Sequence, residues 1–379
     1  MTRLYIIRHA EAEGNLYRRA HGWYDSRITE NGMRQIAALE GRFADLQVDA
    51  AYSSDLTRTQ TTAQAIVRPK HLELRLTPEL REVGMGVWED RTFGDLMFHE
   101  GASMAAFSRC APSWSVPGGE TLAQVADRMK KVIFRIAAEN EGKMVAVFTH
   151  GSAIRCLQAA LRGKHPSEVP ELSHCENTGV TCLEFEGDQA HIIFENDASH
   201  LPAEIATLAR QNWHKKGMHT ANEVWFRPID MGAEGHLYYE ARKDAWESIH
   251  GSLKSFDGPG FVGEAMDRWR MDPRAVELVM LEDTPIGVLE LAMDRDAEEG
   301  VGYVPFVYLQ AGHRFKGMGV QLIGQAVSVY RQLGRKALRL RCAPDNDVAQ
   351  RFYKRYGFHK IGLAPGARVP LELLEKKID

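Results

Sequence analysis

The chain has 379 residues, of which 44% are hydrophobic and 26% are charged, and its formal net charge is −4. This length exceeds what one hydrophobic core usually organises, so we expect two domains. The charge balance excludes a basic footprint for nucleic acid or an anionic membrane, and no apolar run approaches the roughly 20 residues that span a bilayer.

The start of the chain and its cysteines indicate a cellular compartment. Met1 is followed almost at once by the short apolar run 4–7, which predicts no secretory leader. The cysteines contain no CxxC pair, which favours free thiols in a reducing compartment. We therefore expect a cytoplasmic protein whose partners are small molecules, and the sequence leaves oligomerisation open.

The first half alternates short apolar strands with amphipathic helices, which predicts a mainly parallel sheet. The predicted strands are 4–7, 50–53, 144–148, 181–185 and 191–194, the last two joined by a hairpin turn at 186–188. Thr29 can cap a helix that runs to about Asp45, Asp55 can cap one that runs to about Val67, and a third helix follows His150.

Residues 203–221 predict a helical connector between domains at 1–202 and 222–379. Pro202 can open this helix and Gly217 can close it, and the segment lacks the glycine and serine of a flexible linker. In the second half, the predicted strands are 224–227, 276–281, 286–293, 303–309 and 337–342. Helices are predicted up to residue 272, from the glycine-rich turn 312–319 to Gly334, and at 348–356.

Charged residues follow the apolar strands of the first half. Arg8-His9 and His150 each come directly after a strand, so in a parallel sheet they lie together at its carboxyl edge. Arg58 lies in the first turn of a helix, and Glu82 follows Leu80-Arg81. One neutral imidazole can attack phosphorus, cations can hold the phosphate oxygens, and a carboxylic acid can protonate the leaving oxygen. This set requires no metal.

Each of these residues also has an ordinary interpretation when taken alone. An Arg-His pair at a strand end is usually structural, Arg58 could form a surface ion pair, and Glu82 could be solvated. His21 has no comparable context, so we interpret it as an ordinary histidine. The conjunction favours phosphoryl chemistry.

These segments resemble the histidine phosphatase (phosphoglycerate mutase-like) superfamily over about residues 1–202. The matching segments are Arg8-His9-Ala10-Glu11-Ala12-Glu13-Gly14-Asn15, 22–29, Ser53-Ser54-Asp55-Leu56-Thr57-Arg58-Thr59, 80–89, Phe148-Thr149-His150-Gly151 and 196–201. Ala10 and Ala12 replace the usual glycine and threonine. The short segment between Glu82 and His150 favours a phosphatase over a mutase.

The resemblance implies a three-layer α/β/α fold and a role for each matching residue. His9 would become a phosphohistidine, and Arg8, Arg58 and His150 would hold the phosphoryl group. Glu82 would act as general acid and then as the base for water. Asn15 would be a donor in the phosphate pocket.

A glycine-rich turn follows the strand predicted at 303–309. It reads Arg314-Phe315-Lys316-Gly317-Met318-Gly319 and opens an amphipathic helix. Backbone N–H groups at a helix N-terminus bind anions, and glycines allow a pyrophosphate to approach closely. Alone, such a turn is also an ordinary connection between a strand and a helix.

The turn resembles motif A of the GNAT N-acetyltransferases, [QR]-x-x-G-x-[GA], within a match over about residues 222–365. Asn346, Ala349 and 352–358 resemble the N-x-x-A-x-x-[FL]-Y-x-x-x-G-F segment of that family. The resemblance implies an α+β fold with a mixed sheet, and acetyl-CoA as co-substrate. The turn would bind the pyrophosphate.

The same resemblance assigns three further residues. Asn346 would contact the cofactor, and Leu309 would lie on the strand that pairs with the pantetheine arm. Tyr353 would be the general acid for the departing thiolate. Glu290 could deprotonate the amine, or it could belong to the polar face of an ordinary strand.

Together the two halves predict a bifunctional enzyme that hydrolyses a phosphomonoester and acetylates an amine. Because both lie on one chain, we expect successive steps on one small metabolite. One alternative makes the second half a CoA-sensing or dimerisation module that regulates the phosphatase. Another makes the first half a binder of phosphorylated ligands, but a binder would not need both a nucleophile and an acid.

Overall fold

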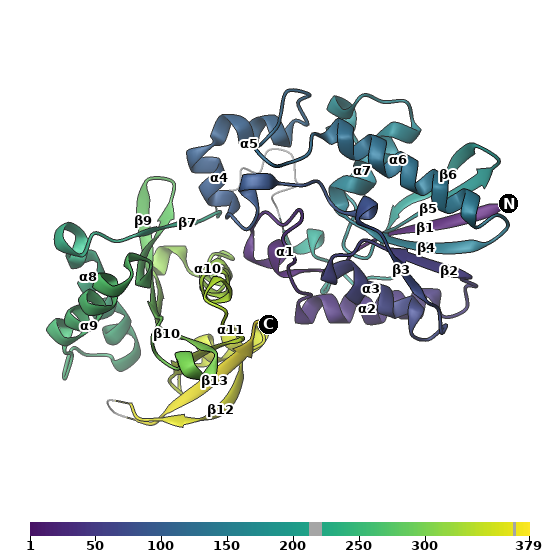
Figure 1. Ribbon diagram of the computed structural model, residues 1–379. Helices are drawn as coiled ribbons and strands as arrows, with labels where there is room; N and C mark the ends of the chain where they lie inside the picture. Colours follow the sequence, from purple (N-terminus) through teal and green to yellow (C-terminus); the bar gives the residue numbers. More distant parts are fainter. Residues whose placement is uncertain (212–221, 367–368) are drawn as a thin grey trace. The chain divides into compact units, whose positions relative to one another are not determined.

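The computed structural model describes residues 1–211, 222–366 and 369–379. The chain divides into two compact units (Figure 1), the first comprising residues 1–91 and 96–220 and the second residues 92–95 and 221–379. Each unit is built on its own sheet. Of the predicted connector, residues 203–211 contain the 3-10 turn Leu208–Arg210, and residues 212–221 lie outside the described part of the chain.

The first unit contains a six-stranded sheet in the order β3-β2-β4-β1-β5-β6. Its strands are β1 (Thr2–Arg8), β2 (Ala50–Ser53), β3 (Leu74–Leu76), β4 (Met144–Thr149), β5 (Val180–Glu186) and β6 (Gln189–Asp197). Strands β3, β2, β4 and β1 are parallel, whereas β5 and β6 each run antiparallel to their neighbours. The prediction of a mainly parallel sheet is therefore wrong, and the sheet is mixed. The short turn between β5 and β6 joins antiparallel strands, because a parallel pair needs a long crossover.

Helices cover both faces of this sheet (Figure 1). α2 (Glu30–Phe43) and α3 (Thr57–Val67) lie on one face, and α6 (Leu122–Glu139) and α7 (Gly151–Leu161) lie on the other. The other helical segments of this part of the chain are α1 (Glu13–Tyr17), α4 (Phe93–His99), α5 (Gly101–Ser108), η1 (Pro78–Leu80), η2 (Gly86–Trp88) and η3 (Pro166–Glu171).

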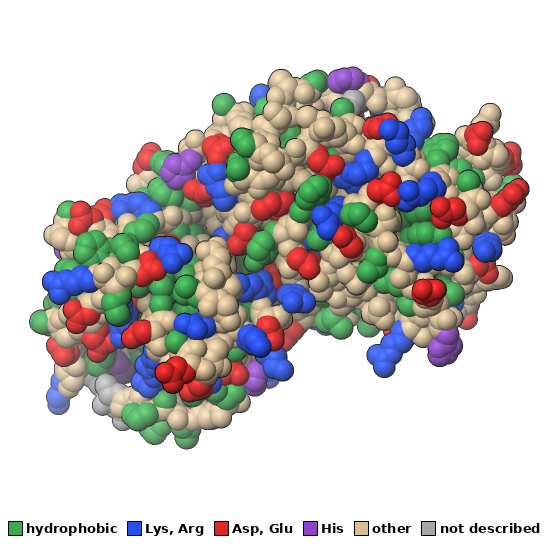
Figure 2. All heavy atoms as spheres, viewed as in Figure 1, with side chains coloured by type: hydrophobic (Ala, Val, Ile, Leu, Met, Phe, Trp, Pro, Cys, Tyr) green, Lys and Arg blue, Asp and Glu red, His purple; other side chains and the backbone are tan. Residues whose placement is uncertain are grey.

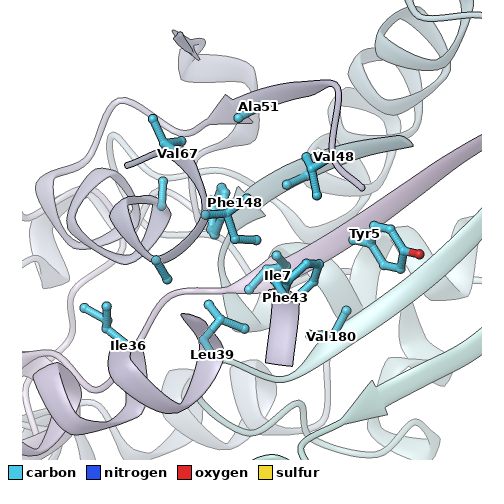
Figure 3. Packing of buried hydrophobic residues seen from close by; sticks show 14 of the residues in the cluster. Tyr5, Ile7, Ile36, Leu39, Phe43, Val48, Ala51, Val67, Phe148 and Val180 are labelled. Carbon is cyan, nitrogen blue, oxygen red and sulfur yellow. The ribbon is translucent and has the colours of Figure 1, made fainter. Parts of the chain in front are cut away.

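One hydrophobic core joins α2 and α3 to the sheet (Figure 3). Side chains alternate along a strand, so Ile7 and Phe148 point to the same face, where they pack with Leu39 and Phe43. All four are at most 1% exposed. Truncating a buried leucine such as Leu39 to alanine typically costs about 2–5 kcal/mol. This core holds β1 and β4 in register, and their ends carry the candidate site.

The two predicted helix caps have different outcomes. The Thr29 side chain accepts a hydrogen bond from Gly32 N at 3.0 Å and caps α2, as predicted. The prediction for Asp55 is wrong, because its carboxylate instead accepts two bonds from Arg81, at 2.6 and 2.5 Å. Asp25, from a distant loop, accepts the N–H and hydroxyl of Thr57 at the start of α3.

The second unit contains a seven-stranded mixed sheet in the order β12-β13-β11-β10-β9-β8-β7. Its strands are β7 (Trp225–Pro228), β8 (Val276–Leu281), β9 (Thr284–Ala292), β10 (Val301–Leu309), β11 (Ala337–Cys342), β12 (His359–Ala364) and β13 (Leu371–Lys377). Strands β10 and β11 are parallel, and the other neighbours are antiparallel. The sequence predicted β7 to β11 but missed β12 and β13.

α8 (Met231–His250) and α9 (Gly258–Met271) pack on one face of this sheet, in a core with β7 to β10. α10 (Gly319–Gln332) packs on the other face, in a second core. Gly334 follows α10 with φ +71°, which confirms it as the C-terminal residue that ends the helix. α11 (Asp347–Arg355) and the 3-10 turns η5 (Pro273–Ala275), η6 (Ala297–Glu299) and η7 (Ala311–His313) complete the unit.

Strands β10 and β11 pair only over their first parts. The pairing runs from Val301↔Ala337 to Val304↔Leu340, whereas β10 continues to Leu309. A register shift between Tyr303 and Phe306 in the β9–β10 pairing marks an irregularity at the same level. The backbone of 305–309 is therefore not paired to β11, and the two strands part there.

Positive and negative side chains are interspersed on the face shown in Figure 2. This distribution agrees with the small net charge of −4. Within residues 1–211, 222–366 and 369–379, no helix has the length and apolar character that crossing a bilayer requires.

Candidate active sites

The ends of β1 and β4 bring two histidines together. Arg8 pairs with Thr149 in the last register position of these parallel strands, so His9 and His150 both leave the sheet at its carboxyl edge. Their ring centroids are 5.3 Å apart. Both side chains are almost fully buried, with exposed fractions of 2% and 0%. The structure thus places the pair where parallel strands predicted it.

The hydrogen bond of His9 determines which of its nitrogens can react. Nδ1 lies 2.7 Å from the carbonyl oxygen of Ala10, which can only accept, so Nδ1 carries the proton. Burial lowers the pKa of His9 well below 6.5, and the charges of Arg58 and Arg8 lower it further. The ring is therefore neutral at neutral pH, with its lone pair on Nε2. A nucleophilic imidazole needs this state.

The guanidinium of Arg58 is fully buried and is held by a loop. Its terminal nitrogens donate to the carbonyl oxygens of His21 (3.0 Å), Gly22 (2.6 Å) and Tyr24 (2.9 Å). Burial lowers the pKa of Arg58 to about 10, so it remains a cation at neutral pH. Arg8 is also buried and donates from Nη1 to Cys175 O at 2.5 Å.

The loop that holds Arg58 is itself held by a carboxylate. Glu89 accepts hydrogen bonds from the backbone N–H groups of Trp23 (2.6 Å), Tyr24 (2.8 Å) and Met85 (3.0 Å). Its charge also acts on Arg58. Glu89 therefore positions the carbonyl groups that orient the guanidinium.

Several buried nitrogens at this site have no hydrogen-bond partner among the described residues. They are Arg8 Nε, Arg58 Nε, and both Nδ1 and Nε2 of His150. Buried polar atoms are nearly always paired in native proteins, so such a group calls for an explanation. All four belong to residues that the sequence assigned to a phosphoryl group, whose oxygens would accept from Arg8 Nε, from Arg58 Nε and from the His150 nitrogen that carries the proton.

Glu82 lies at the N-terminus of α7. Its Oε1 accepts from Val83 N (3.0 Å) and Ala153 N (2.9 Å), and its Oε2 accepts from Ser152 N (2.9 Å). His150 is the N-cap residue of the same helix, so the first turn of α7 fixes the positions of both Glu82 and His150. Within the described chain, Oε2 accepts a single bond and retains a free lone pair for proton exchange.

The sequence interpretation missed His21. Its ring centroid lies 5.8 Å from that of His9, and burial, Arg58 and Arg8 lower its pKa well below 6.5. Asn15 Nδ2 lies 3.3 Å from its Nε2, and Ser26 Oγ lies 2.9 Å from its Nδ1. Asn15 therefore reaches the site through His21. The place of His21 directly before segment 22–29 was a weak signal, because its contacts with His9, Asn15 and Ser26 arise only in the folded chain.

In the second unit, the glycine-rich turn lies between η7 and α10. Phe315 and Gly317 both have left-handed backbone, with φ of +62° and +81°. Alternation of backbone hand turns successive N–H groups toward one side and forms an anion cradle. The neighbours Lys316 and Phe315 are exposed, Met318 is buried, and Gly319 begins the helix. This geometry fits the pyrophosphate of acetyl-CoA.

The turn is anchored to the end of β10. Arg314 Nε donates to the carbonyl oxygen of Leu309 at 2.8 Å, and its Nη2 lies 3.2 Å from Asp244 Oδ2. Leu309 lies on the part of β10 that is not paired to β11. The free backbone between the parted strands is the place where the sequence predicted the pantetheine arm.

Tyr353 lies on α11, beside this turn. A Cβ on Gly319 would lie 3.2 Å from the Phe352 ring, so the start of α10 packs closely on α11. Burial, followed by the charge of Cys342, raises the pKa of Tyr353 above 10. The phenol therefore keeps its proton at neutral pH, as a general acid must. Asn346 caps α11 by accepting from Ala349 N at 3.1 Å.

Glu290 lies on β9 and is fully buried. Its two oxygens form ion pairs with Arg242 and Arg268, and the Tyr238 hydroxyl donates to it at 2.8 Å. A carboxylate held by two guanidinium groups is poorly suited to take a proton from an amine. The contacts favour a structural role, in which Glu290 positions the two arginines.

Comparison with known proteins gives the family of each half. The profile of the histidine phosphatase superfamily (branch 1) matches residues 4–198, and that of the acetyltransferase (GNAT) family matches residues 238–358. The probable phosphoglycerate mutases GpmB of Proteus mirabilis and Cronobacter sakazakii are each 32% identical over 186 residues, 49% of this chain and 86% of theirs. The solved structure of Bacillus stearothermophilus YhfR has a TM-score of 0.51 and 28% identity, covering 53% of this chain and 99% of that one. The chain therefore belongs to the histidine phosphatase superfamily, and its second half carries an acetyltransferase domain of the GNAT family.

Proposed function

We propose that the first domain hydrolyses a phosphomonoester through a phosphohistidine at His9. Nε2 of His9 attacks phosphorus, and the bond to the leaving oxygen breaks as Glu82 gives that oxygen a proton. Water then attacks phosphorus, Glu82 takes its proton, and the electrons of the P–N bond return to His9. Arg8, Arg58 and His150 hold the phosphoryl oxygens, and Asn15 supports the pocket through His21.

The unpartnered buried nitrogens of Arg8, Arg58 and His150 are the observation that carries this proposal. His150 has its ring centroid 5.3 Å from that of His9, and the charges of Arg58 and Arg8 act on His9, whose Nδ1 proton is already bonded to Ala10 O. Preorganised donors of this kind stabilise charge without reorganisation during the reaction. No step of the proposed mechanism calls on a metal ion.

We propose that the second domain transfers an acetyl group from acetyl-CoA to an amine. The turn from Arg314 to Gly319 would hold the pyrophosphate, and Leu309 would lie along the pantetheine arm. Acetyl-CoA supplies the activated thioester. Tyr353 would donate its proton to the departing sulfur, and Asn346 would hold α11 in place through its cap and contact the cofactor.

We further propose that the domains occupy residues 1–202 and 222–379, joined by 203–221, and that they act in succession on one small metabolite. Their presence on one chain supports this link. Separately expressed domains that act on unrelated compounds would contradict it.

A phosphoglycerate mutase is the second candidate for the first domain, because the similar GpmB proteins are named as probable mutases. A mutase would return the phosphoryl group from His9 to a second hydroxyl of phosphoglycerate. Incubation with 3-phosphoglycerate distinguishes the two, since a phosphatase releases inorganic phosphate and a mutase forms 2-phosphoglycerate.

The test of the first domain is phosphate release from a panel of phosphorylated metabolites, with His9→Ala as the matched variant. We expect the wild type to release phosphate and to become labelled on histidine by a 32P-phosphorylated substrate. His9→Ala should do neither. Phosphate release that persists in His9→Ala would contradict the phosphohistidine mechanism.

Tyr353→Phe tests whether the second domain is a transferase or a CoA sensor. Phenylalanine keeps the ring packing against Phe352 and Phe358 but removes the proton. Loss of a general acid typically slows the reaction by about 10²–10⁴-fold, with CoA binding unchanged. A CoA-dependent change in phosphatase rate that survives this substitution, without acetyl transfer in the wild type, would favour the sensor.

A further inference from the structure

A second group of arginines surrounds Tyr303 in the acetyltransferase domain. Tyr303 lies on β10 at the level where the pairing with β11 is about to end, and its side chain is 3% exposed. The guanidinium carbon of Arg295 lies 3.7 Å from the centroid of its ring, and that of Arg341 lies 5.9 Å away. Two cations therefore flank one aromatic side chain.

The guanidinium group of Arg341 has few hydrogen-bond partners in the described chain. Its Nε is buried and has no hydrogen-bond partner among the described residues, and its Nη1 donates only to Pro365 O at 3.4 Å. In the described chain no carboxylate forms an ion pair with it. Burying donors without a carboxylate is costly, so a ligand that supplies oxygen acceptors would stabilise this arrangement.

Arg295 is also weakly neutralised. Its nearest carboxylate is that of Asp296, at 3.9 Å. That carboxylate is shared with Arg339, which lies 2.9 Å from it. Arg339 also binds Glu299 (3.0 Å) and Glu375 (2.8 Å), so it takes most of the negative charge on this part of the sheet.

The remaining charges near Tyr303 are already paired. Arg268 also acts on Tyr303, but its guanidinium binds Glu290 and Glu264. Arg242 binds Glu290 as well. Of the cations in the described chain whose charge acts on Tyr303, Arg295 and Arg341 are therefore the two that remain available to a ligand.

The position of Arg341 connects these cations with the transfer site. Arg341 follows Leu340, the last β11 residue that pairs with β10, so it stands where the two strands part. Side chains alternate along β11, so Arg341 and Cys342 point to opposite faces. Cys342 lies close enough to Tyr353 for its charge to act on it. Tyr353, the proposed acid for the CoA sulfur, and the two arginines thus lie on opposite faces of the sheet at the point where β10 and β11 part.

We infer that the acyl acceptor is an amine that also carries an anionic group, a phosphate or a carboxylate, and that Arg341 and Arg295 bind this group beside Tyr303. This inference rests on the proposed acetyltransferase function and adds the chemical class of the acceptor. Guanidinium groups bind both anions through paired N–H donors. The anion would hold the acceptor on the face opposite Tyr353, with its amine directed to the gap between β10 and β11.

The experiment measures CoA release from acetyl-CoA with matched pairs of amines. Phosphoethanolamine is compared with ethanolamine, and β-alanine with propylamine, so that the two anions are tested separately. Full-length His9→Ala protein is used throughout, because it should not hydrolyse the phosphorylated amine. The variants Arg341→Gln, Arg341→Lys and Arg295→Gln are made in this background. Arg270→Gln, at a 67% exposed position on α9, is the control.

We expect one anionic amine to be acetylated with a kcat/KM at least tenfold above that of its neutral partner. Arg341→Gln and Arg295→Gln should each raise the KM for that amine by about 10- to 100-fold, the range for losing a charged hydrogen bond. The KM for acetyl-CoA should not change, and Arg341→Lys should recover part of the loss. Equal turnover of neutral and anionic amines, or an equal loss with both, would overturn the inference and leave the transferase function standing.

Calorimetric titration with 2-aminoethylphosphonate in the presence of CoA separates failure of the inference from failure of the proposed function. If no amine is acetylated but Arg341→Gln weakens phosphonate binding at least tenfold, the anion site stands and the transferase function falls. If no amine is acetylated and binding is the same in both proteins, the inference is overturned as well.

Discussion

The imidazole Nδ1 of His9 donates to the carbonyl oxygen of Ala10, the next residue in the chain, at 2.7 Å. This local bond leaves Nε2 as the basic nitrogen of the ring. Arg58 and Arg8 add positive charge nearby, and burial removes solvent. Burial first, and then the charges of Arg58 and Arg8, lower the pKa of His9 and keep the ring neutral, which is the state that the proposed nucleophile requires.

The first prediction concerns the pH dependence of phosphate release. The lowered pKa of His9 means that its neutral form persists as the pH falls below 6.5. The acid limb of kcat/KM should therefore have its midpoint below 6.5, when measured with two aryl phosphates whose own pKa values differ. A common midpoint at or above 6.5 for both substrates would show that His9 is not the neutral nucleophile.

The second prediction concerns Glu89, a positioning residue. In Glu89→Gln an amide NH₂ group would replace one of the two carboxylate oxygens that accept from backbone N–H groups. An N–H group that loses its acceptor lowers the free energy of unfolding by about 1–3 kcal/mol. Because these N–H groups hold the loop that orients Arg58, phosphate release should fall about 10- to 100-fold in kcat/KM, and orthovanadate should inhibit less strongly. Glu195→Gln, which breaks a half-exposed pair with Arg162, is the control and should change neither. Unchanged vanadate inhibition in Glu89→Gln would limit the residue to a stability role.

The third prediction concerns Gly317. Its φ of +81° favours glycine, while a Cβ would find open space, so Gly317→Ala tests backbone conformation alone. We expect a cost of about 1–2 kcal/mol in the left-handed conformation and a KM for acetyl-CoA raised about tenfold. Gly312→Ala is matched, because that position is equally open and has no left-handed φ. Equal effects of the two substitutions would argue against a backbone anion cradle.

The fourth prediction concerns stability at acid pH. Burial, and then Arg42, lowers the pKa of His200 from 6.5 to about 4. Arg42 Nη1 lies 3.1 Å from Nδ1 of His200 and must donate to it, so that nitrogen has to be unprotonated. Between about pH 6.5 and 4 the unfolded chain therefore binds this proton and the folded chain does not, so the stability present above pH 6.5 falls as the pH falls.

In urea unfolding at pH 7 and pH 5, His200→Asn should lose less unfolding free energy on acidification than the parent protein. His191→Asn, at an exposed position on β6, controls for the loss of a histidine as such. An identical loss in His200→Asn and the parent protein would mean that His200 does not contribute to the acid sensitivity.

The sequence predicted most strands and the residues that end them, because those signals are local. An apolar run followed by Arg8-His9 or by His150 indicates a strand end, and parallel pairing then brings such ends together. It missed β3 and β12, whose residues are mostly exposed, and β13, whose residues are mostly half-buried, because none of them has a clear apolar face. The hairpin of β5 and β6 was predicted and is confirmed, but the antiparallel pairing of β5 with β1 was not foreseen, because alternation of strands and helices does not indicate the direction in which a later strand joins the sheet.

The candidate sites show the same division. Residue types and their places along the chain were enough to single out His9, Arg58, Glu82, His150 and the turn at 314–319 as candidates, and the family resemblance added Tyr353. Other residues could be found only from contacts between segments far apart in the sequence. These contacts place His21 near His9, Glu89 against the loop that holds Arg58, and Arg341 beside Tyr303. Burial and neighbouring charge set the protonation state and the available donors of these groups, and both arise only when distant segments pack together. The sequence by itself determined which candidate groups the chain carries and in what order, whereas the tertiary structure decided which of them are neutral, which are charged and which have no hydrogen-bond partner among the described residues.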